Sequence, residues 1–251
     1  MNSGCICCSL VGDFGAALKD VITKYHPDRI IIEPSGVGKL SDVIKAVDGV
    51  EKEAGVALNS ATTVVDVMKC KMYLRNFGEF FENQVKSAGT IILSRTDKAD
   101  TAKVEAAVKM LRELNPEAHI ITTPVEVLGG KKVLDTMEGA IINLAQVEEE
   151  EHHHHHHDHD ADEVFTSWGV ETARKFSKAD IEHALTELDT GNYGMILRSK
   201  GIVDGGADGW LEFDYVPGEW EVRARGADVG GKLVVIGSKL DEKAIAALFG
   251  C

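Results

Sequence analysis

The sequence predicts an α/β protein with a helix-covered parallel sheet in its N-terminal part and a small α+β domain in its C-terminal part. Three observations indicate this. Short apolar runs alternate with amphipathic helical patterns through residues 1–147. Residues 148–162 contain no apolar side chain except Ala161. Strand-like segments then follow one another between glycine-rich turns in residues 163–251. We therefore expect two domains, 1–147 and 163–251, joined by a linker at 148–162.

Four strands are expected in the N-terminal domain. Each is a short run of branched or apolar residues, as in a buried parallel strand. The runs are Arg29–Ile32, Ala61–Val67, Thr90–Leu93 and His119–Thr123. A helical pattern precedes each of them, at Phe14–Lys24, Leu40–Val47, Lys69–Phe81 and Ala102–Leu114. Strands that alternate with helices predict a parallel sheet with helices on both faces.

The linker reads EEEEHHHHHHDHDAD and holds seven acids and no base, which is half of the net charge of −14. Such a segment cannot bury enough apolar surface to join a core, so we expect it to be solvated. Its six consecutive histidines lie inside the chain, whereas expression tags are placed at chain ends, and we interpret them as native.

A mostly antiparallel sheet with two helices is expected in the C-terminal domain. The expected strands are Val164–Val170, Tyr193–Lys200, Trp210–Val216, Trp220–Arg225 and Lys232–Ile236. The first helix is expected at Lys178–Leu188, with Ser177 as its N-cap. The second is expected at Asp241–Phe249, with Gly250 directly after it.

Composition excludes several classes of protein. Hydrophobic residues make up 44% of the chain, enough for a buried core. No stretch approaches the roughly 18 apolar residues of a membrane helix, and the N-terminus has no signal pattern. We therefore expect a cytoplasmic protein with no membrane partner. A chain with a net charge of −14 would repel phosphate backbones, so we expect no nucleic-acid partner. The oligomeric state stays open, homo-oligomers included.

Three of the five cysteines lie together in Gly4-Cys5-Ile6-Cys7-Cys8. An odd number packed in this way is a poor disulfide framework, and in a reducing compartment it favours metal or redox chemistry. A disulfide between the adjacent Cys7 and Cys8 would be strained, which favours metal. Three thiolates can hold a tetrahedral zinc ion and leave the fourth position for an exchanging partner. The alternative is buried, unreactive cysteine.

A second group of candidate metal ligands lies in the linker, interleaved with Asp158 and Asp160. The ligands are His152, His153, His154, His155, His156, His157 and His159. Such a run binds Zn, Ni, Co or Cu loosely, with interchangeable sets of imidazoles. The alternative is a linker that is charged and solvated only.

Glu33-Pro34-Ser35-Gly36 ends the first expected strand. A Mg²⁺-nucleotide site places its acid at such a strand end, and a glycine there lets the backbone approach the γ-phosphate. The alternative is an ordinary strand end. Gly36-Val37-Gly38-Lys39 imitates a phosphate loop, but the full G-x-x-x-x-G-K-[ST] pattern needs Gly at position 33 and Ser or Thr at position 40. Glu33 and Leu40 stand at those positions.

Ser94-Arg95-Thr96-Asp97 follows the strand expected at Thr90–Leu93. A carboxylate there can accept hydrogen bonds from guanine N1 and N2, and a long cation beside it can stack on the base. The simpler alternative is a turn into the next helix, with Asp97 as a cap.

Together these motifs resemble the CobW family of GTP-dependent metal chaperones. The loop at residues 4–8 resembles the family's metal motif, and Glu33-Pro34-Ser35-Gly36 its Walker B Glu-x-x-Gly. Thr63-Val64-Val65-Asp66 resembles the following strand, and Ser94-Arg95-Thr96-Asp97 stands where the family has its guanine-reading Asn-Lys-x-Asp. The acidic His-rich linker is typical, and residues 163–251 resemble the CobW C-terminal domain.

The resemblance implies a P-loop-NTPase-like sheet and a protein that delivers Zn²⁺ or Co²⁺ to a client metalloprotein, with GTP and Mg²⁺ as cofactors. Cys5, Cys7 and Cys8 would bind the metal. Glu33 and Gly36 would sense Mg²⁺ and the γ-phosphate. Ser94, Arg95 and Asp97 would contact the base.

The chain also departs from the family pattern. The family's first strand, Walker A loop and first switch precede the cysteine motif, and none of them is present in this sequence. We therefore expect an N-terminally truncated form that is inactive alone as a GTP hydrolase. Ser94 replaces the usual Asn and Arg95 the usual Lys. The rival interpretation is a non-catalytic metal buffer that uses the cysteine loop and the histidine tract.

Overall fold

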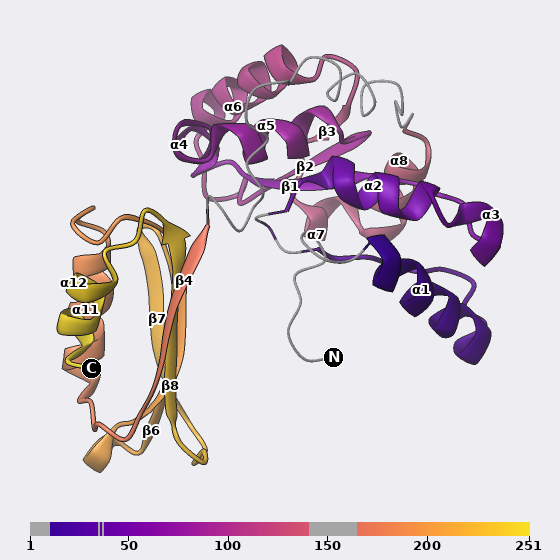
Figure 1. The fold of residues 1–251 in the computed structure, drawn as a ribbon. Helices are drawn as coiled ribbons and strands as arrows, with labels where there is room; N and C mark the ends of the chain where they lie inside the picture. Colours follow the sequence, from indigo (N-terminus) through magenta and orange to yellow (C-terminus); the bar gives the residue numbers. More distant parts are fainter. Residues whose placement is uncertain (1–10, 35, 37, 141–164) are drawn as a thin grey trace. The chain divides into compact units, whose positions relative to one another are not determined.

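The computed structural model describes residues 11–34, 36, 38–140 and 165–251 of the chain, which divides into two compact units (Figure 1). Met1–Ala161 form the N-terminal unit and Asp162–Cys251 the C-terminal unit. The expected fold class is confirmed. The N-terminal unit contains a three-stranded parallel sheet with helices, and the C-terminal unit contains a five-stranded antiparallel sheet. The linker expected at 148–162 lies outside the described residues.

Strands β1 (Thr62–Asp66), β2 (Thr90–Ser94) and β3 (His119–Ile121) form the parallel sheet in that order. Asp66 and Ser94 are register partners, so the carboxyl ends of β1 and β2 lie at one edge. The described helices of this unit are α1 (Val11–Tyr25), α2 (Leu40–Asp48), α3 (Glu51–Ala54), α4 (Cys70–Asn76), α5 (Gly78–Lys86), α6 (Thr101–Leu114), α7 (Val125–Leu128) and α8 (Gly130–Glu138).

Helices cover the two faces of this sheet unequally. On one face, Val85 of α5 and Leu111 of α6 pack against Val65, Ile91 and other residues of β1 and β2. On the other face, Val133 of α8 packs against Ile92 and Ile121. Val64 lies beside Ile92 in the register but is 66% exposed. Among the described residues, the second face is therefore covered over β2 and β3 and left uncovered over β1.

The prediction of a strand at Arg29–Ile32 is wrong. The segment has no strand hydrogen bonding, and the described sheet ends at β1 without a further neighbour. Ile30 and Ile32 pack beside Leu18 and Val47, whereas Ile31 is 87% exposed. A β-strand exists only when its backbone groups pair with an adjacent strand, and a favourable sequence cannot supply that partner.

The prediction of a single helix at Lys69–Phe81 is also wrong, because two helices, α4 and α5, occupy this segment. They meet at Phe77, whose φ of −134° and ψ of 37° are not helical. Phe77 is 7% exposed, so burial of its ring accompanies the bend. Packing therefore overrides a continuous helical pattern. The short helices α3, α7 and α8 have no counterpart among the expected elements.

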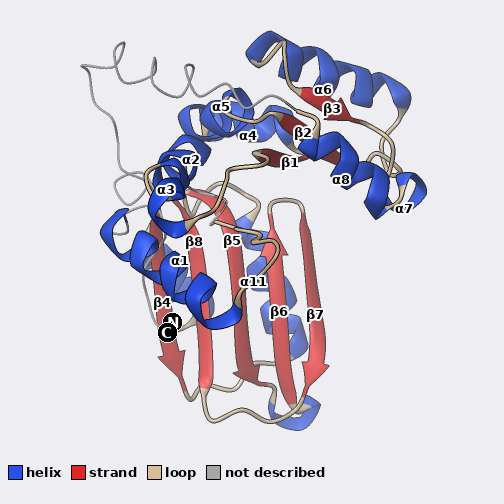
Figure 2. Cartoon of the chain, turned by 90° about the vertical axis from the view of Figure 1, so that its right-hand side faces the viewer, coloured by secondary structure: helices blue, strands red, loops and turns tan. Residues whose placement is uncertain are grey.

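The C-terminal unit is a sheet of strand order β4-β8-β5-β6-β7 with antiparallel neighbours, seen face-on in Figure 2. Its elements are β4 (Thr166–Thr172), α11 (Lys178–Leu188), β5 (Met195–Asp204), a 3-10 turn (Gly206–Asp208), β6 (Trp210–Val216), β7 (Glu219–Arg225), β8 (Gly231–Ser238) and α12 (Glu242–Phe249). Helices α11 and α12 cover one face (Figure 1).

Helix α11 begins and ends as expected. The Ser177 side chain accepts a hydrogen bond from the Asp180 backbone N–H, and the Asp180 carboxylate accepts one from the Ser177 N–H, which is a capping box. Helix α12 begins one residue later than expected, because the Asp241 side chain caps it by accepting from the Ala244 N–H.

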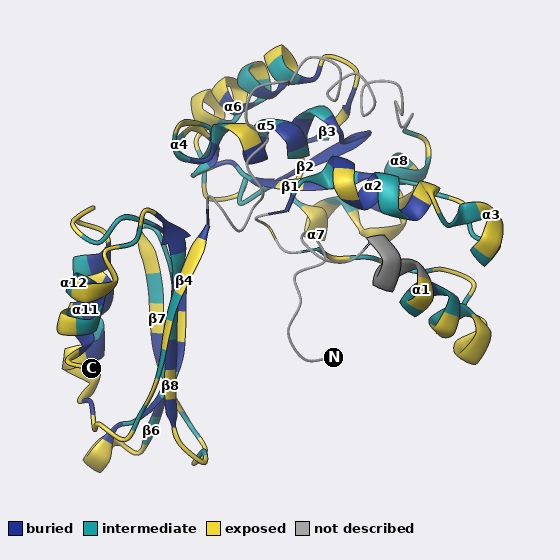
Figure 3. Cartoon of the chain, viewed as in Figure 1, coloured by how far each residue is buried: buried dark blue, intermediate teal, exposed yellow. Residues whose placement is uncertain are grey.

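Burial alternates along the strands of this sheet (Figure 3). In β6, Phe213 and Tyr215 are buried in the core with Leu185, Ile245 and other residues of the two helices. The residues of β6 that alternate with the buried ones face the opposite side of the sheet, which no described element of this unit covers. We call this side the open face.

None of the described helices has the length and apolarity that a membrane crossing requires.

Candidate functional site

The carboxyl edge of the parallel sheet holds an ion pair between two neighbouring strands. Asp66 is the last residue of β1, and Arg95 follows β2 directly. The Arg95 Nε lies 3.5 Å from the Asp66 Oδ2, and both side chains are partly buried. The other carboxylate oxygen of Asp66 accepts a hydrogen bond of 2.9 Å from the Met68 N–H. Asp66 therefore fixes both the turn after β1 and the guanidinium after β2.

Arg95 has an unusual backbone conformation. Its φ of 59° lies in the left-handed region, which costs a residue with a side chain roughly 1–2 kcal/mol. Such strain persists only where the surroundings fix it, and it is common at ligand-binding loops. Beside it, Thr96 Oγ1 is buried without a hydrogen-bond partner among the described residues.

Two side chains of α4, Cys70 and Tyr73, lie within the electrostatic reach of Asp66. Burial, and then the charge of Asp66, raise the pKa of Tyr73, while Arg95 opposes the shift. The pKa of the Cys70 thiol is also raised, chiefly by burial. Cys70 is therefore held as a neutral thiol, and the thiolate that metal binding requires is disfavoured there.

Three of the predicted nucleotide contacts, Ser94, Arg95 and Asp97, lie at the carboxyl end of β2 and just beyond it. Ser94 ends the strand, and its hydroxyl donates to the Val65 carbonyl at 3.5 Å. Asp97 is exposed, and Asp100 rather than Asp97 caps α6, by accepting from the Lys103 N–H at 2.7 Å. The capping role considered for Asp97 is thus filled by another residue, and its carboxylate is presented to solvent.

Helix α5 holds the segment that contains Gly36. The Gln84 side-chain amide donates to the Gly36 carbonyl at 2.9 Å and to the Gly38 carbonyl at 3.0 Å. The Gln84 backbone carbonyl accepts from the Thr63 hydroxyl at 2.7 Å. One residue of α5 thereby connects the Gly36 segment to strand β1.

A second contact fixes the start of α2 against the same helix. Asn83 accepts from the Ser41 N–H at 3.2 Å and donates to the Ser41 hydroxyl at 2.9 Å. All four atoms belong to residues that are buried.

Lys39 already has partners within the chain. Its Nζ lies 2.9 Å from the Glu79 Oε1 and 5.9 Å from the centre of the Phe80 ring. The side chain is 17% exposed. This lysine serves the packing of α2 against α5.

Glu33 and Gly36 are exposed. A Cβ built at Gly36 would meet no atom within 4 Å, and its φ is not in the left-handed region. Nothing in the described structure therefore requires glycine here. The described contacts bring Asp66 and Arg95 together and connect Gly36 to Gln84, but they do not join Glu33 or Gly36 to Ser94, Arg95 or Asp97.

The predicted metal ligands lie outside the described residues. These are Cys5, Cys7, Cys8, His152, His153, His154, His155, His156, His157 and His159. Within the described ranges, no three His, Cys, Asp or Glu side chains gather as a metal site.

Sequence reasoning missed the roles of Asp66, Tyr73 and Gln84. A signal existed for Asp66, because an acid that ends a predicted strand lies at the same sheet edge as the residues after the next strand. No signal existed for Gln84, since only the packing of α5 against the Gly36 segment defines its role.

A parallel sheet with helices, followed by a separate unit with an antiparallel sheet, defines the class: an α/β protein of two units, with an ion pair at the carboxyl edge of its parallel sheet. Residues 1–122 match the family described as CobW/HypB/UreG, nucleotide-binding domain, and residues 165–251 match the cobalamin synthesis protein cobW C-terminal domain. The chain belongs to the CobW family.

Individual relatives are distant. The chain is 22% identical over 232 residues to zinc-regulated GTPase metalloprotein activator 1 of Dictyostelium discoideum, covering 80% of this chain and 48% of that protein. It is 27% identical over 128 residues to the zinc chaperone CobW of a Sinorhizobium species, covering 42% of this chain and 36% of that protein. The chain thus spans about half the length, or less, of these curated relatives.

Among solved structures, the Zn(II)-bound YjiA GTPase from E. coli is similar over 93% of this chain and 74% of that chain, at 20% identity and a TM-score of 0.38.

Proposed function

We propose that this chain is part of a GTP-dependent metallochaperone that binds Zn²⁺ or Co²⁺ and delivers it to a client metalloprotein in the cytoplasm. The matched family and the names of the curated relatives, a zinc chaperone and a zinc-regulated GTPase activator, support this proposal.

The observation that carries the proposal is the connection of two predicted nucleotide loops to the same strand. Asp66 at the end of β1 holds Arg95, and Thr63 in β1 is hydrogen-bonded to Gln84, which holds the Gly36 segment. Parallel sheets bind ligands at the carboxyl ends of their strands. A change in either loop on nucleotide binding would therefore act on β1 and, through it, on the other loop.

Each predicted residue has a role in this proposal. Cys5, Cys7 and Cys8 supply thiolates and leave one coordination position through which a client ligand can enter. Glu33 contacts Mg²⁺, and Gly36 lets the backbone approach the γ-phosphate. Asp97 accepts hydrogen bonds from the base, and Arg95 stacks on it.

Histidine residues 152–157 and 159 provide additional, weaker sites for the metal. The C-terminal unit supplies a separate folded surface for the client. GTP hydrolysis would decide when the metal leaves the cysteine loop.

GTP turnover needs more than these residues. A phosphate loop surrounds the phosphates with backbone N–H groups and neutralises them with a lysine. The sequence contains no complete loop of this kind, and Lys39 is already paired with Glu79. We therefore expect the 251-residue chain to bind and hydrolyse GTP negligibly.

The test compares this chain with a version extended upstream by the genomic sequence that precedes it in frame. GTP turnover and fluorescent-nucleotide binding are measured for both. Activity in the extended protein only, together with an upstream G-x-x-x-x-G-K-[ST] motif, supports the proposal. An extended protein that binds metal but no nucleotide would instead support the non-catalytic metal buffer.

A further inference from the structure

Strand β7 is an edge of the C-terminal sheet. All seven of its residues pair with β6, from Glu219 opposite Val216 to Arg225 opposite Trp210. On its other side the described structure has no strand. An edge strand leaves a row of backbone N–H and C=O groups that another strand can pair with.

The charges of β7 are sorted by sign along the strand. Its sequence is Glu219-Trp220-Glu221-Val222-Arg223-Ala224-Arg225, with acids in the first half and arginines in the second. The charged residues alternate with Trp220, Val222 and Ala224. Val222 lies opposite Phe213 and is buried in the helix-covered core, so all four charges lie on the open face.

We propose that two copies of this chain associate by antiparallel pairing of β7 with β7 about a two-fold axis at Val222. In this register Glu219 lies opposite the partner's Arg225, and Glu221 opposite the partner's Arg223. Trp220 lies opposite the partner's Ala224. The two-fold axis repeats each contact, so every charge on the strand faces a charge of opposite sign.

Other registers are disfavoured by the same charges. A shift by two residues places either Glu221 opposite the partner's Glu221 or Arg223 opposite the partner's Arg223. In-register parallel pairing places like charges opposite each other along the whole strand. Like charges directly opposite are destabilising, so the strand specifies one arrangement.

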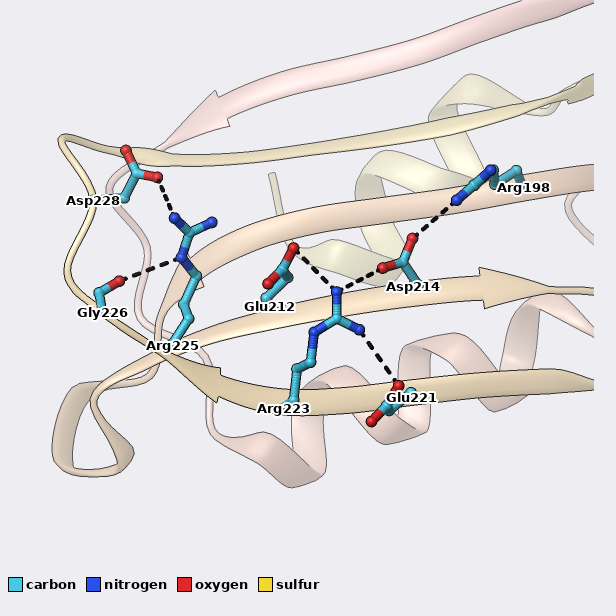
Figure 4. Close-up of polar contacts among 8 residues, drawn as sticks. All are labelled: Arg198, Glu212, Asp214, Glu221, Arg223, Arg225, Gly226 and Asp228. Atoms are coloured by element: carbon cyan, nitrogen blue, oxygen red, sulfur yellow. Dashed lines mark hydrogen bonds and ion pairs between the residues drawn. The ribbon is translucent and has the colours of Figure 1, made fainter. Parts of the chain in front are cut away.

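The arginines are held in place before any partner arrives (Figure 4). The Arg223 Nη2 lies 3.1 Å from the Glu212 Oε1 and 3.0 Å from the Asp214 Oδ2. The Arg225 Nη2 lies 3.2 Å from the Asp228 Oδ2. Cations already fixed in this way lose less side-chain freedom on association.

Glu221 keeps capacity for a second cation. Its carboxylate lies 3.4 Å from Arg223 of the same copy, and its side chain is 70% exposed. A carboxylate has about four acceptor positions, so Glu221 can also accept from the partner's Arg223.

Charges on an edge strand often prevent pairing, which is the simpler explanation for this pattern. Charges prevent the pairing of two edge strands when the second copy places charges of the same sign opposite them. On β7 the sign changes at the middle of the strand, so the pattern excludes wrong registers and permits the two-fold one. The opposite edge, β4, has a single charged residue, Glu171, and provides a matched control.

The test is sedimentation velocity of the full chain over a range of protein concentrations, with EDTA and a thiol reductant so that metal cannot bridge copies. We expect a concentration-dependent dimer. Glu221→Lys should raise the dimer dissociation constant about tenfold or more, because it places cations opposite each other twice per dimer. Glu171→Lys, with the same charge change on β4, should leave the dissociation constant unchanged.

Amide hydrogen exchange then locates the contact. Protection of the β7 amides should rise with protein concentration, while that of β4 should not. A chain that stays monomeric up to the highest protein concentration measured would overturn the proposal. So would a dimer that tolerates Glu221→Lys, dissociates on Glu171→Lys, or leaves β7 exchange unchanged.

Discussion

Arg95 and Asp66 form an ion pair across the carboxyl ends of β1 and β2, and Arg95 holds a left-handed backbone conformation in doing so. The family pattern has lysine at this position, whose compact ammonium makes no planar, directed fork. A guanidinium can keep its contact with Asp66 and still offer a flat face for stacking on a base. Arginine in place of lysine at position 95 therefore changes how the cation is held, while the charge at this position stays the same.

The cysteine loop should bind about one Co²⁺ or Zn²⁺ tightly, because three thiolates are a preferred ligand set for these ions. Titration of the reduced chain with Co²⁺ should give the intense thiolate absorption of a tetrahedral site. The combined Cys5→Ser, Cys7→Ser and Cys8→Ser variant should lose it. Cys251→Ser removes an exposed free thiol and is the control that should keep it. Equal spectra for the wild type and the triple variant would contradict the assignment.

Removal of residues 152–159 should lower the metal stoichiometry and leave the tight site in place. The lost sites should be the weaker ones, which disappear below about pH 6.5 as imidazoles take up protons. Calorimetric Zn²⁺ titrations at two pH values check this. If the tight site disappears with the deletion, the thiolates and imidazoles form a single site.

Lys39→Ala should weaken the fold of the N-terminal unit by about 0.5–1.5 kcal/mol, since it removes the partner of Glu79 and the cation beside Phe80. It should not change nucleotide binding, which we expect to be negligible already. Glu79→Gln removes only the ion pair and should destabilise by less. Urea unfolding and fluorescent-nucleotide titration give the two readouts. Micromolar GTP binding that Lys39→Ala abolishes would make residues 36–39 a true phosphate loop.

Gly201→Ala should destabilise the C-terminal unit by about 1–3 kcal/mol through overpacking. A Cβ at this position would lie 2.6 Å from the Phe213 Cε1 and 2.8 Å from the Leu233 Cβ, both in the core. Gly169→Ala, in β4 of the same sheet, meets its nearest atom at 3.6 Å and should cost little. Thermal unfolding of both variants checks the difference, and equal losses would show that strand propensity rather than crowding decides.

Asp214 should contribute to stability at neutral pH and lose that contribution in acid. Burial alone would raise its pKa, but hydrogen bonds from Arg223 and Arg198 hold the pKa below its usual value. The folded state therefore binds fewer protons than the unfolded state, so the contribution is complete above about pH 3.9 and is lost as pH falls through the lower folded pKa.

Asp214→Asn tests this pH dependence. At pH 7 the variant should be less stable by at most about 1 kcal/mol, because the carboxylate is partly exposed and screened. The difference from the wild type should shrink below about pH 4. The pKa of Asp180 is also lowered, but both proteins contain Asp180. Its contribution to the pH dependence therefore cancels in the difference between them. A difference that is constant from pH 7 to pH 3 would show that the Asp214 charge is not responsible.

The elements predicted best are those whose signals are local. Helix α11 begins and ends as expected because Ser177 and Asp180 cap it within its own sequence. Strand β2 was predicted because its residues are buried on both faces and form an unbroken apolar run. Arg29–Ile32 has the same kind of run but forms no strand, since pairing depends on a neighbour elsewhere in the chain.

The candidate site shows the same division. Sequence motifs indicated Glu33, Gly36, Ser94, Arg95 and Asp97 as contacts for the nucleotide, and their roles remain predictions. The connections from Arg95 to Asp66 and from Gly36 to Gln84 come from packing between segments far apart in the chain. No spacing rule encodes such contacts, so they had to be observed.

The strand order β4-β8-β5-β6-β7 has a consequence for synthesis on the ribosome. Strand β8 lies between β4 and β5, although it is the last strand to be translated. Strands β5, β6 and β7 can pair as they emerge, but β4 has no neighbour until residues 231–238 leave the exit tunnel. The C-terminal unit therefore closes only after β8 has emerged, and a nascent chain that has emerged only as far as Arg225 would present an unpaired β4 and the unpaired edge of β5 to chaperones.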